Sequence, residues 1–334
     1  MPVPVLPPGT RSVRRLASIP LLSVAALVVL AGCVNRPVPP PGNKVVFGLG
    51  ATASGARTSR LGRETTLGMY STWYNGPGDL AWLREWADDE VPNAYRAGKA
   101  HHLIVWTGDA ETTFSTKYGS ACGRPYPLSS RFLSDMTTLA ETFAGAANGP
   151  ALYVTLFTEL QTYPCTDNQW NPNAPTNAYL RALKDRYVEA RNVFREHAPN
   201  ARVSLGWGGW QAEWDAPATG GGRSMIGSFA DVMTVSDFQS VQAMSNTSSV
   251  AQVSDMTRIL GRYGPVMVAH FKPDNVSQAT FDADVARLFT DTSMAGLKRN
   301  GLFAFSFMDS ANLAVEGSYQ RVKAAVLRYG APAG

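Results

Sequence analysis

Apolar, β-branched runs alternate with amphipathic stretches along most of the chain. A short apolar run suits a buried strand, and apolar residues at three- and four-residue spacing suit a helix. Strands are predicted at 45–50, 67–73, 102–106, 152–157, 203–207, 232–235, 266–269 and 302–307. Helices are predicted at 79–97, 129–147, 176–197, 249–263, 278–299 and 318–329.

This alternation predicts an α/β protein with a single (β/α)8 TIM barrel rather than an open, doubly wound sheet. The 334 residues are enough for one such barrel with additions. The glycine-rich segments at 206–209 and 220–222 lack the GxGxxG and GxxxxGK[ST] spacings of nucleotide-binding loops. In a barrel, the chemistry is expected where strands end and the following loops begin.

The N-terminus has a different pattern. Arg11, Arg14 and Arg15 precede an apolar run at 16–29, which is followed by Leu-Ala-Gly-Cys at 30–33. This order resembles a bacterial lipoprotein signal peptide, which implies lipidation of Cys33, with a palmitate among the attached chains. The alternative is a transmembrane helix, but the apolar run is shorter than the roughly 20 residues that span a bilayer.

We therefore predict three segments: a signal peptide at 1–32, the lipidated Cys33 with a Pro-rich tether at 33–43, and the barrel domain at 44–334. The expected location is the outer face of a bacterial cell membrane, with the membrane as a partner through the lipid anchor.

Charge and cysteine content limit the partners and cofactors that are expected. Removing the three arginines of the signal peptide from the 30 basic residues leaves 27 against 26 acidic ones, so no nucleic-acid partner is expected. Cys122 and Cys165 are an even pair in an exported chain and predict a disulfide. No HxxxH or CxxC spacing supports a metal site, and no cofactor is predicted.

Aromatic residues and carboxylates follow the predicted strands. Trp and Tyr faces stack on sugar rings, carboxylates and amides bind hydroxyl groups, and glycosidic hydrolysis uses two carboxyl groups. Glu159, which ends the apolar run of the fourth strand, is the first catalytic candidate, with Asp237 and Asp109 as possible partners. The predicted substrate-binding residues are Trp73, Tyr74, Trp106, Gln161, Trp207, Trp210, His270 and Asp309.

These motifs resemble a clan A glycoside hydrolase, most closely family 26, which is β-mannanase-like. The similar segments are Leu61-Gly62-Arg63, the aromatic-rich second strand, and 229–238, which is similar to the family's sixth strand. The resemblance implies that Glu159 is the acid/base at the end of strand four. It departs at strand seven, where His270 stands in place of the nucleophilic Glu, and at Thr158, where the clan usually has Asn and family 26 has His.

Three interpretations of Glu159 remain open. It is a general acid with Asp237 or Asp109 as its partner, a ligand for sugar hydroxyls in a barrel without turnover, or the partner of Arg57 or Arg60 in an ion pair. His270 is either a structural or substrate-contacting residue, or one that orients a carboxylate or a water. The predicted function is hydrolysis of O-glycosidic bonds in a polysaccharide, and the alternative is a non-catalytic carbohydrate-binding lipoprotein.

Overall fold

A computed structural model describes residues 36–165, 173–215 and 224–333. Eight parallel strands form a closed barrel, in which the first strand pairs with the last, Val46 lying opposite Ala304. The predicted TIM-barrel fold is confirmed. The barrel strands are β1 Val45–Leu49, β2 Met69–Tyr74, β3 Ala100–Val105, β6 Leu152–Leu156, β7 Ala201–Gly208, β8 Gln239–Ala243, β9 Val266–Phe271 and β10 Leu302–Phe307.

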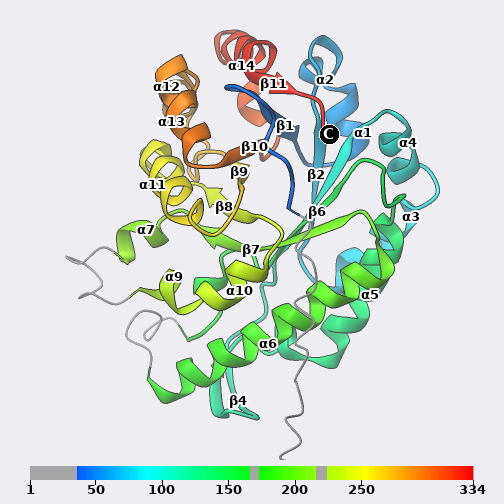
Figure 1. Ribbon diagram of the computed structural model, residues 1–334, viewed down its shortest axis with the longest axis vertical. Helices are drawn as coiled ribbons and strands as arrows, with labels where there is room; N and C mark the ends of the chain where they lie inside the picture. Colours follow the sequence, from blue (N-terminus) through cyan, green and yellow to red (C-terminus); the bar gives the residue numbers. More distant parts are fainter. Residues whose placement is uncertain (1–35, 166–172, 216–223, 334) are drawn as a thin grey trace, which may run out of the picture. The chain divides into compact units, whose positions relative to one another are not determined.

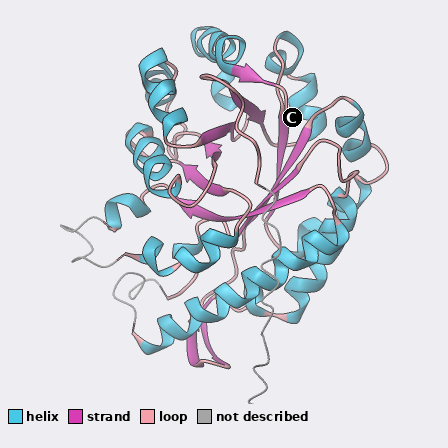
Figure 2. Ribbon diagram, viewed as in Figure 1, coloured by secondary structure: helices cyan, strands magenta, loops and turns pink. Residues whose placement is uncertain are grey.

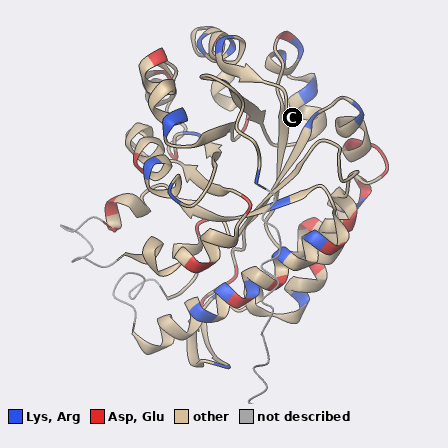
Figure 3. Ribbon diagram, in the orientation of Figure 1, with Lys and Arg blue, Asp and Glu red and all other residues tan. Residues whose placement is uncertain are grey.

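Helices surround the strands (Figure 1) and bury the outward-facing side chains of the barrel. Charged residues lie mainly on helices and loops, whereas the strands carry few of them (Figure 3). Two of the predicted helices, 79–97 and 278–299, are each divided into two. The helices are α1 Ala53–Thr58, α2 Arg60–Glu64, α3 Leu80–Glu85, α4 Glu90–Arg96, α5 Ser130–Phe143, α6 Ala174–His197, α7 Gln211–Trp214, α9 Met225–Ser228, α10 Ala230–Val235, α11 Val250–Leu260, α12 Gln278–Leu288, α13 Asp291–Arg299 and α14 Glu316–Tyr329.

The sixth strand was predicted in the wrong segment. The apolar residues at 232–235 end helix α10, and the strand is β8, whose sequence is QSVQA. Alternate residues of a strand face the same side, and Ser240 and Gln242 both face the barrel interior. There Ser240 joins a hydrogen-bonded layer and Gln242 lines the pocket, so both are polar. A search for an apolar run therefore passes over this strand.

The interior of the barrel is layered. Its lower layer is apolar and includes Met69, Tyr153, Phe238 and Phe303. A fully buried chain of hydrogen bonds crosses the layer above it, from Ser306 through Ser71, His102 and Thr155 to Ser240. Each of these five polar side chains therefore has a hydrogen-bond partner, as buried polar groups require.

A two-stranded hairpin projects from the loop after β3 (Figure 2). Its strands are β4 Thr112–Thr116 and β5 Gly119–Gly123, and β5 packs against α6. Cys122 of β5 forms a disulfide with Cys165, as predicted, with 5.5 Å between the Cα atoms. The backbone N–H of Arg124 also donates to the carbonyl of Tyr163, at 2.9 Å. The hairpin therefore braces the loop that follows Glu159.

Residues 36–44 lie against the N-terminal end of the barrel. The Arg36 guanidinium donates to the carbonyl of Tyr263, at 3.0 Å, and Lys298 Nζ donates to the carbonyl of Pro40, at 2.8 Å. Residues 38–41 also line a cavity of about 360 Å³ together with side chains from the starts of strands, including Val46, Tyr153 and Phe303. The short strand β11 Gly330–Ala331 pairs with β1 at the same end.

Candidate functional site

A pocket of about 510 Å³ lies at the C-terminal ends of the barrel strands. Its lining combines indole rings with a few polar groups and two methionines. This mixture of apolar walls and a small number of placed polar groups is typical of a small-molecule site. The lining residues are Trp73, Asn75, Trp106, Thr158, Glu159, Trp210, Gln242, Met244, His270, Asp274 and Met308.

Glu159 is carried into the pocket by an unusual turn. Strand β6 ends at Leu156, and both Phe157 and Glu159 adopt left-handed backbone conformations, with φ of 55° and 60°. Between them, the backbone N–H of Thr158 donates to the carbonyl of Val105, at 2.9 Å. Such conformations are strained for residues other than glycine and are concentrated at functional sites.

The carboxyl group of Glu159 lies in an environment that favours its protonated form. Burial raises its pKa, and the nearby Asp274 acts in the same direction. The Arg124 guanidinium and hydrogen bonds from Gln242 and Trp106 oppose this shift without cancelling it. A carboxyl group that stays protonated to a higher pH than usual is suited to general acid catalysis.

Three side chains connect Glu159 to the opposite wall of the pocket. Gln242 Nε2 donates to Glu159 Oε1, and Gln242 Oε1 lies 3.0 Å from Nδ1 of His270. On its other side, His270 Nε2 accepts a hydrogen bond from the indole N–H of Trp73. Burial lowers the pKa of His270 to about 3, so its ring is neutral near pH 7.

Alternation along the strands separates the predicted aromatic residues into two groups. Trp73, Trp106 and Trp210 line the pocket. Tyr74 is fully buried on the outer side of its strand, where its hydroxyl donates to Asp135 at 2.8 Å. Trp207 is also fully buried and packs its ring edge-on against Phe229. The predicted substrate contacts of Tyr74 and Trp207 are therefore wrong, because consecutive residues of a strand face opposite sides.

The remaining predicted substrate-binding residues have different positions. His270 lines the pocket. Gln161 is buried behind the wall, where its Oε1 accepts from the backbone N–H of Gly208 at 3.1 Å. Asp309 lies outside the lining and pairs with Lys272 at 2.6 Å.

Asp237 is not a partner of Glu159. It precedes β8 and is therefore at the N-terminal end of the barrel, where it is fully buried. Its carboxylate accepts from the backbone N–H of Val203, at 2.9 Å, and lies 3.2 Å from Arg191 and 3.8 Å from Arg195. The predicted catalytic role is wrong because it assumed that the strand preceded Asp237.

Asp109 also lies outside the pocket lining. It is half-buried, and its Oδ2 accepts from the backbone N–H of Tyr126, at 2.9 Å. This bond ties together the two ends of the segment that contains the hairpin. Asp109 has no described hydrogen bond to Glu159, so the structure does not support its predicted role as the catalytic partner.

Four polar residues of the lining were missed as site residues: Asn75, Thr158, Gln242 and Asp274. Gln242 belongs to β8, the strand that was predicted elsewhere. Asp274, which is exposed, lies in the loop after β9 and is the other carboxylate of the lining besides Glu159. The sequence carried a signal for Asp274, because it follows His270 closely at the end of the seventh strand.

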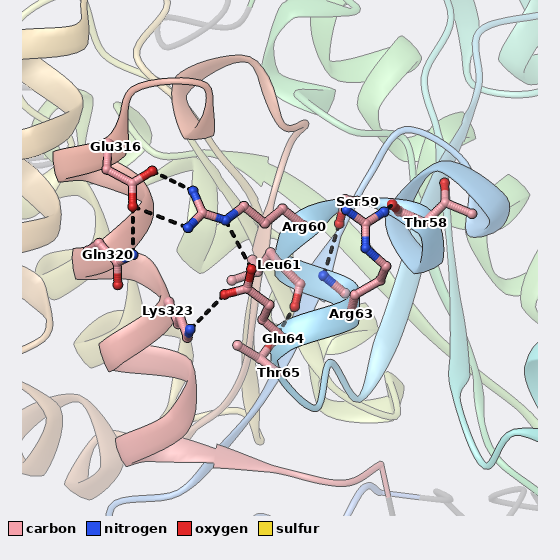
Figure 4. Close-up of polar contacts among 11 residues, drawn as sticks. Thr58, Ser59, Arg60, Leu61, Arg63, Glu64, Thr65, Glu316, Gln320 and Lys323 are labelled. Atoms are coloured by element: carbon pink, nitrogen blue, oxygen red, sulfur yellow. Dashed lines mark hydrogen bonds and ion pairs between the residues drawn. The ribbon is translucent and has the colours of Figure 1, made fainter.

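The interpretation of Glu159 as an ion-pair partner is not supported. Arg60 pairs instead with Glu64 of its own helix, at 3.0 Å, and with Glu316 of α14 (Figure 4). Lys323 joins the same cluster through Glu64, at 2.6 Å. Within 36–165, 173–215 and 224–333, the structure contains no ion pair of Glu159 with Arg57 or any other residue.

Two further features concern the described part of the chain. No helix there has the length and apolar character needed to cross a bilayer. No group of three or more His, Cys, Asp or Glu side chains in these residues has an arrangement suited to a metal ion. The signal peptide and Cys33 lie outside the described residues, so their assignments stay predictions.

Comparison with known proteins identifies the fold but assigns no family. No protein-family model and no curated protein matches the chain. Among solved structures, a psychrophilic family 10 endo-β-1,4-xylanase has a TM-score of 0.54 at 11% identity, covering 84% of this chain and 96% of that one. A GH5_18 protein from Streptomyces cattleya, solved with GlcNAc, has a TM-score of 0.51 at 12% identity, covering 86% and 80%.

The GH53 catalytic domain of Ignisphaera aggregans has a TM-score of 0.50 at 13% identity, covering 82% of this chain and 87% of that one. These neighbours are clan A glycoside hydrolases with the same eight-stranded barrel. At such identities the similarity concerns the fold alone. Membership of family 26 stays a prediction.

Proposed function

We propose that this protein binds a glycan in the pocket and hydrolyses its glycosidic bonds, with Glu159 as general acid and Asp274 as general base. The observation that carries the proposal is the partly buried carboxyl group of Glu159, with its raised pKa, in a pocket walled by Trp73, Trp106 and Trp210. The similarity to barrels of polysaccharide-degrading enzymes agrees with it. The proposed location, exported and lipid-anchored through Cys33, rests on the N-terminal sequence pattern.

The two carboxyl groups have environments that suit different roles. Glu159 is largely buried, whereas Asp274 is exposed on a loop. A buried acid gives its proton to the leaving oxygen, and a solvated carboxylate takes a proton from the attacking water. Because water attacks directly in such a scheme, the anomeric configuration of the product is inverted.

The test is a polysaccharide screen with the wild-type protein, followed by two variants on any substrate found. Glu159→Gln is expected to lower kcat by about 10²- to 10⁴-fold, since it removes the general acid. Asp274→Asn is expected to lower kcat as well. Glu111→Gln makes the same chemical change at an exposed residue outside the pocket and is the control. Unchanged activity in Glu159→Gln, or retention of configuration in the product, contradicts the assignment.

A second candidate function is glycan binding without turnover. It is favoured by His270, a neutral imidazole at the end of β9 with a hydrogen-bond partner at each ring nitrogen, where the resembling clan carries a carboxylate nucleophile. Under this alternative, glycans bind to the wild-type protein in calorimetry, and no reducing ends are released from them.

A further inference from the structure

The hydrogen bonds from Trp73 to Glu159 run in one direction. An indole N–H is a donor only, so Nε2 of His270 accepts from Trp73 and carries no proton. In a neutral imidazole the proton is then on Nδ1, which donates to Gln242 Oε1 at 3.0 Å. With its oxygen engaged in this way, the Gln242 amide directs its N–H groups toward Glu159.

We propose that His270 is a positioning residue, which fixes the orientation of the Gln242 amide and thereby the protonation geometry of Glu159. Oε1 of Glu159 is held as an acceptor by the directed N–H of Gln242, and Trp106 donates a further hydrogen bond to the same carboxyl group. This role rests on the proposed function of Glu159. In this scheme Trp73 forms a wall of the pocket and also fixes the tautomer of His270.

The opposite orientation would change the acid. If Nε2 of His270 carried the proton, two donors would face each other at Trp73, and Nδ1 would require a donor from Gln242. The amide would then rotate and present its oxygen to Glu159, which disfavours the carboxylate and raises the pKa of the acid. The charged groups that also act on Glu159 are Arg124 and Asp274, and neither touches His270 or Gln242 through a described hydrogen bond or ion pair.

Two measurements test this role without any substrate. The first is the tautomer of His270, read from the ¹⁵N shifts of its ring in the wild-type protein. The chain has four histidines, so the spectrum is small. The expected result is a protonated Nδ1 and an unprotonated Nε2, and loss of this fixed tautomer in Trp73→Phe. His101, which lies between the rings of Tyr95 and Phe143, is the internal control and should not change.

The second measurement is the titration of the Glu159 carboxyl carbon by ¹³C NMR, with Glu159→Gln to identify the signal. His270→Phe and Gln242→Leu are each expected to move the midpoint to higher pH. Gln242→Leu removes the N–H donor, and His270→Phe removes the contact that fixes its orientation. The double variant is expected to move it no further than Gln242→Leu alone, because His270 acts through Gln242. A residue that supported the pocket only through packing would not show this dependence.

The outcomes separate the two proposals. A protonated Nε2, additive shifts in the double variant, or an unchanged midpoint in His270→Phe overturns the positioning role, whatever the protein hydrolyses. A polysaccharide screen without turnover overturns the enzymatic function and leaves these measurements standing. With a substrate in hand, the alkaline limb of the kcat/KM profile should move to higher pH in His270→Phe, since activity then persists until the acid loses its proton.

Discussion

Two carboxylates lie at opposite ends of this barrel, Asp237 fully buried and Glu159 partly buried, and their surroundings differ. Asp237, at the N-terminal end, lies beside two arginines and accepts a backbone hydrogen bond. Glu159, at the C-terminal end, receives hydrogen bonds from neutral donors and is in no described ion pair. The ion pairs of Asp237 serve the fold, whereas Glu159, whose hydrogen-bond donors are neutral, has a raised pKa.

The largest expected effect concerns stability at the Asp237 end. Asp237→Ala leaves Arg191 buried without its carboxylate, and we expect a loss of about 3–5 kcal/mol in the free energy of unfolding. Chemical denaturation measures it. The control is Asp255→Ala, which breaks an exposed pair with Arg258 and should cost less than about 1 kcal/mol. A loss of similar size in both variants would show that the buried ion pair has no special structural role.

The next effect concerns how the Glu159 end is held together. The disulfide between Cys122 and Cys165 joins the hairpin to the loop after Glu159 and closes a separation of 43 residues. Replacing both cysteines by alanine is expected to cost about 2–4 kcal/mol in unfolding free energy. Thermal unfolding with and without reductant measures it, and reductant should have no further effect on the double variant. An equal stability of the two proteins would mean that the loop is held by other contacts.

The smallest expected effect is a gain of stability at Glu159. Because folding raises the pKa of Glu159, the folded protein binds more protons than the unfolded chain between the ordinary value of 4.5 and the raised one. The contribution of Glu159 to stability therefore falls as the pH rises through this window, and is lost above it. Glu159→Gln removes this dependence, and we expect the variant to be more stable by about 0.5–2 kcal/mol at pH 7.

Denaturation of both proteins from pH 4 to pH 8 tests this last expectation. The difference in unfolding free energy should grow across the window and then level off. A constant difference would place the pKa of Glu159 at its ordinary value and would make its surroundings equivalent to those of an exposed carboxylate.

The same two carboxylates show how much of the fold could be predicted from the sequence. In sequence, Glu159 and Asp237 each follow a short apolar run, and the two runs look alike. One run is a barrel strand, and the other ends helix α10. The eightfold alternation was enough to predict the barrel and the location of Glu159, because seven of the eight predicted segments overlap barrel strands. It was not enough for β8, whose inward residues are polar.

The types of residue in the site could be predicted better than the individual residues. Trp73 and Tyr74 are adjacent at the end of β2, yet only Trp73 faces the pocket. Choosing between them requires the phase of the strand alternation, which an apolar run covered on both faces does not reveal. Gln242 was not predicted as a site residue because its strand was placed elsewhere. The hydrogen-bonded link between His270 and Glu159 was therefore not predicted either.

The attachment of residues 36–44 has a practical consequence. These residues contact the end of the barrel opposite the pocket, through Arg36 and Pro40. A solid support or a fusion partner joined at Arg36 would therefore be attached at the end of the barrel opposite the pocket. A long polymer crossing the opening would meet the indole walls without passing the point of attachment, so immobilisation through the N-terminal side is the arrangement that leaves the pocket accessible.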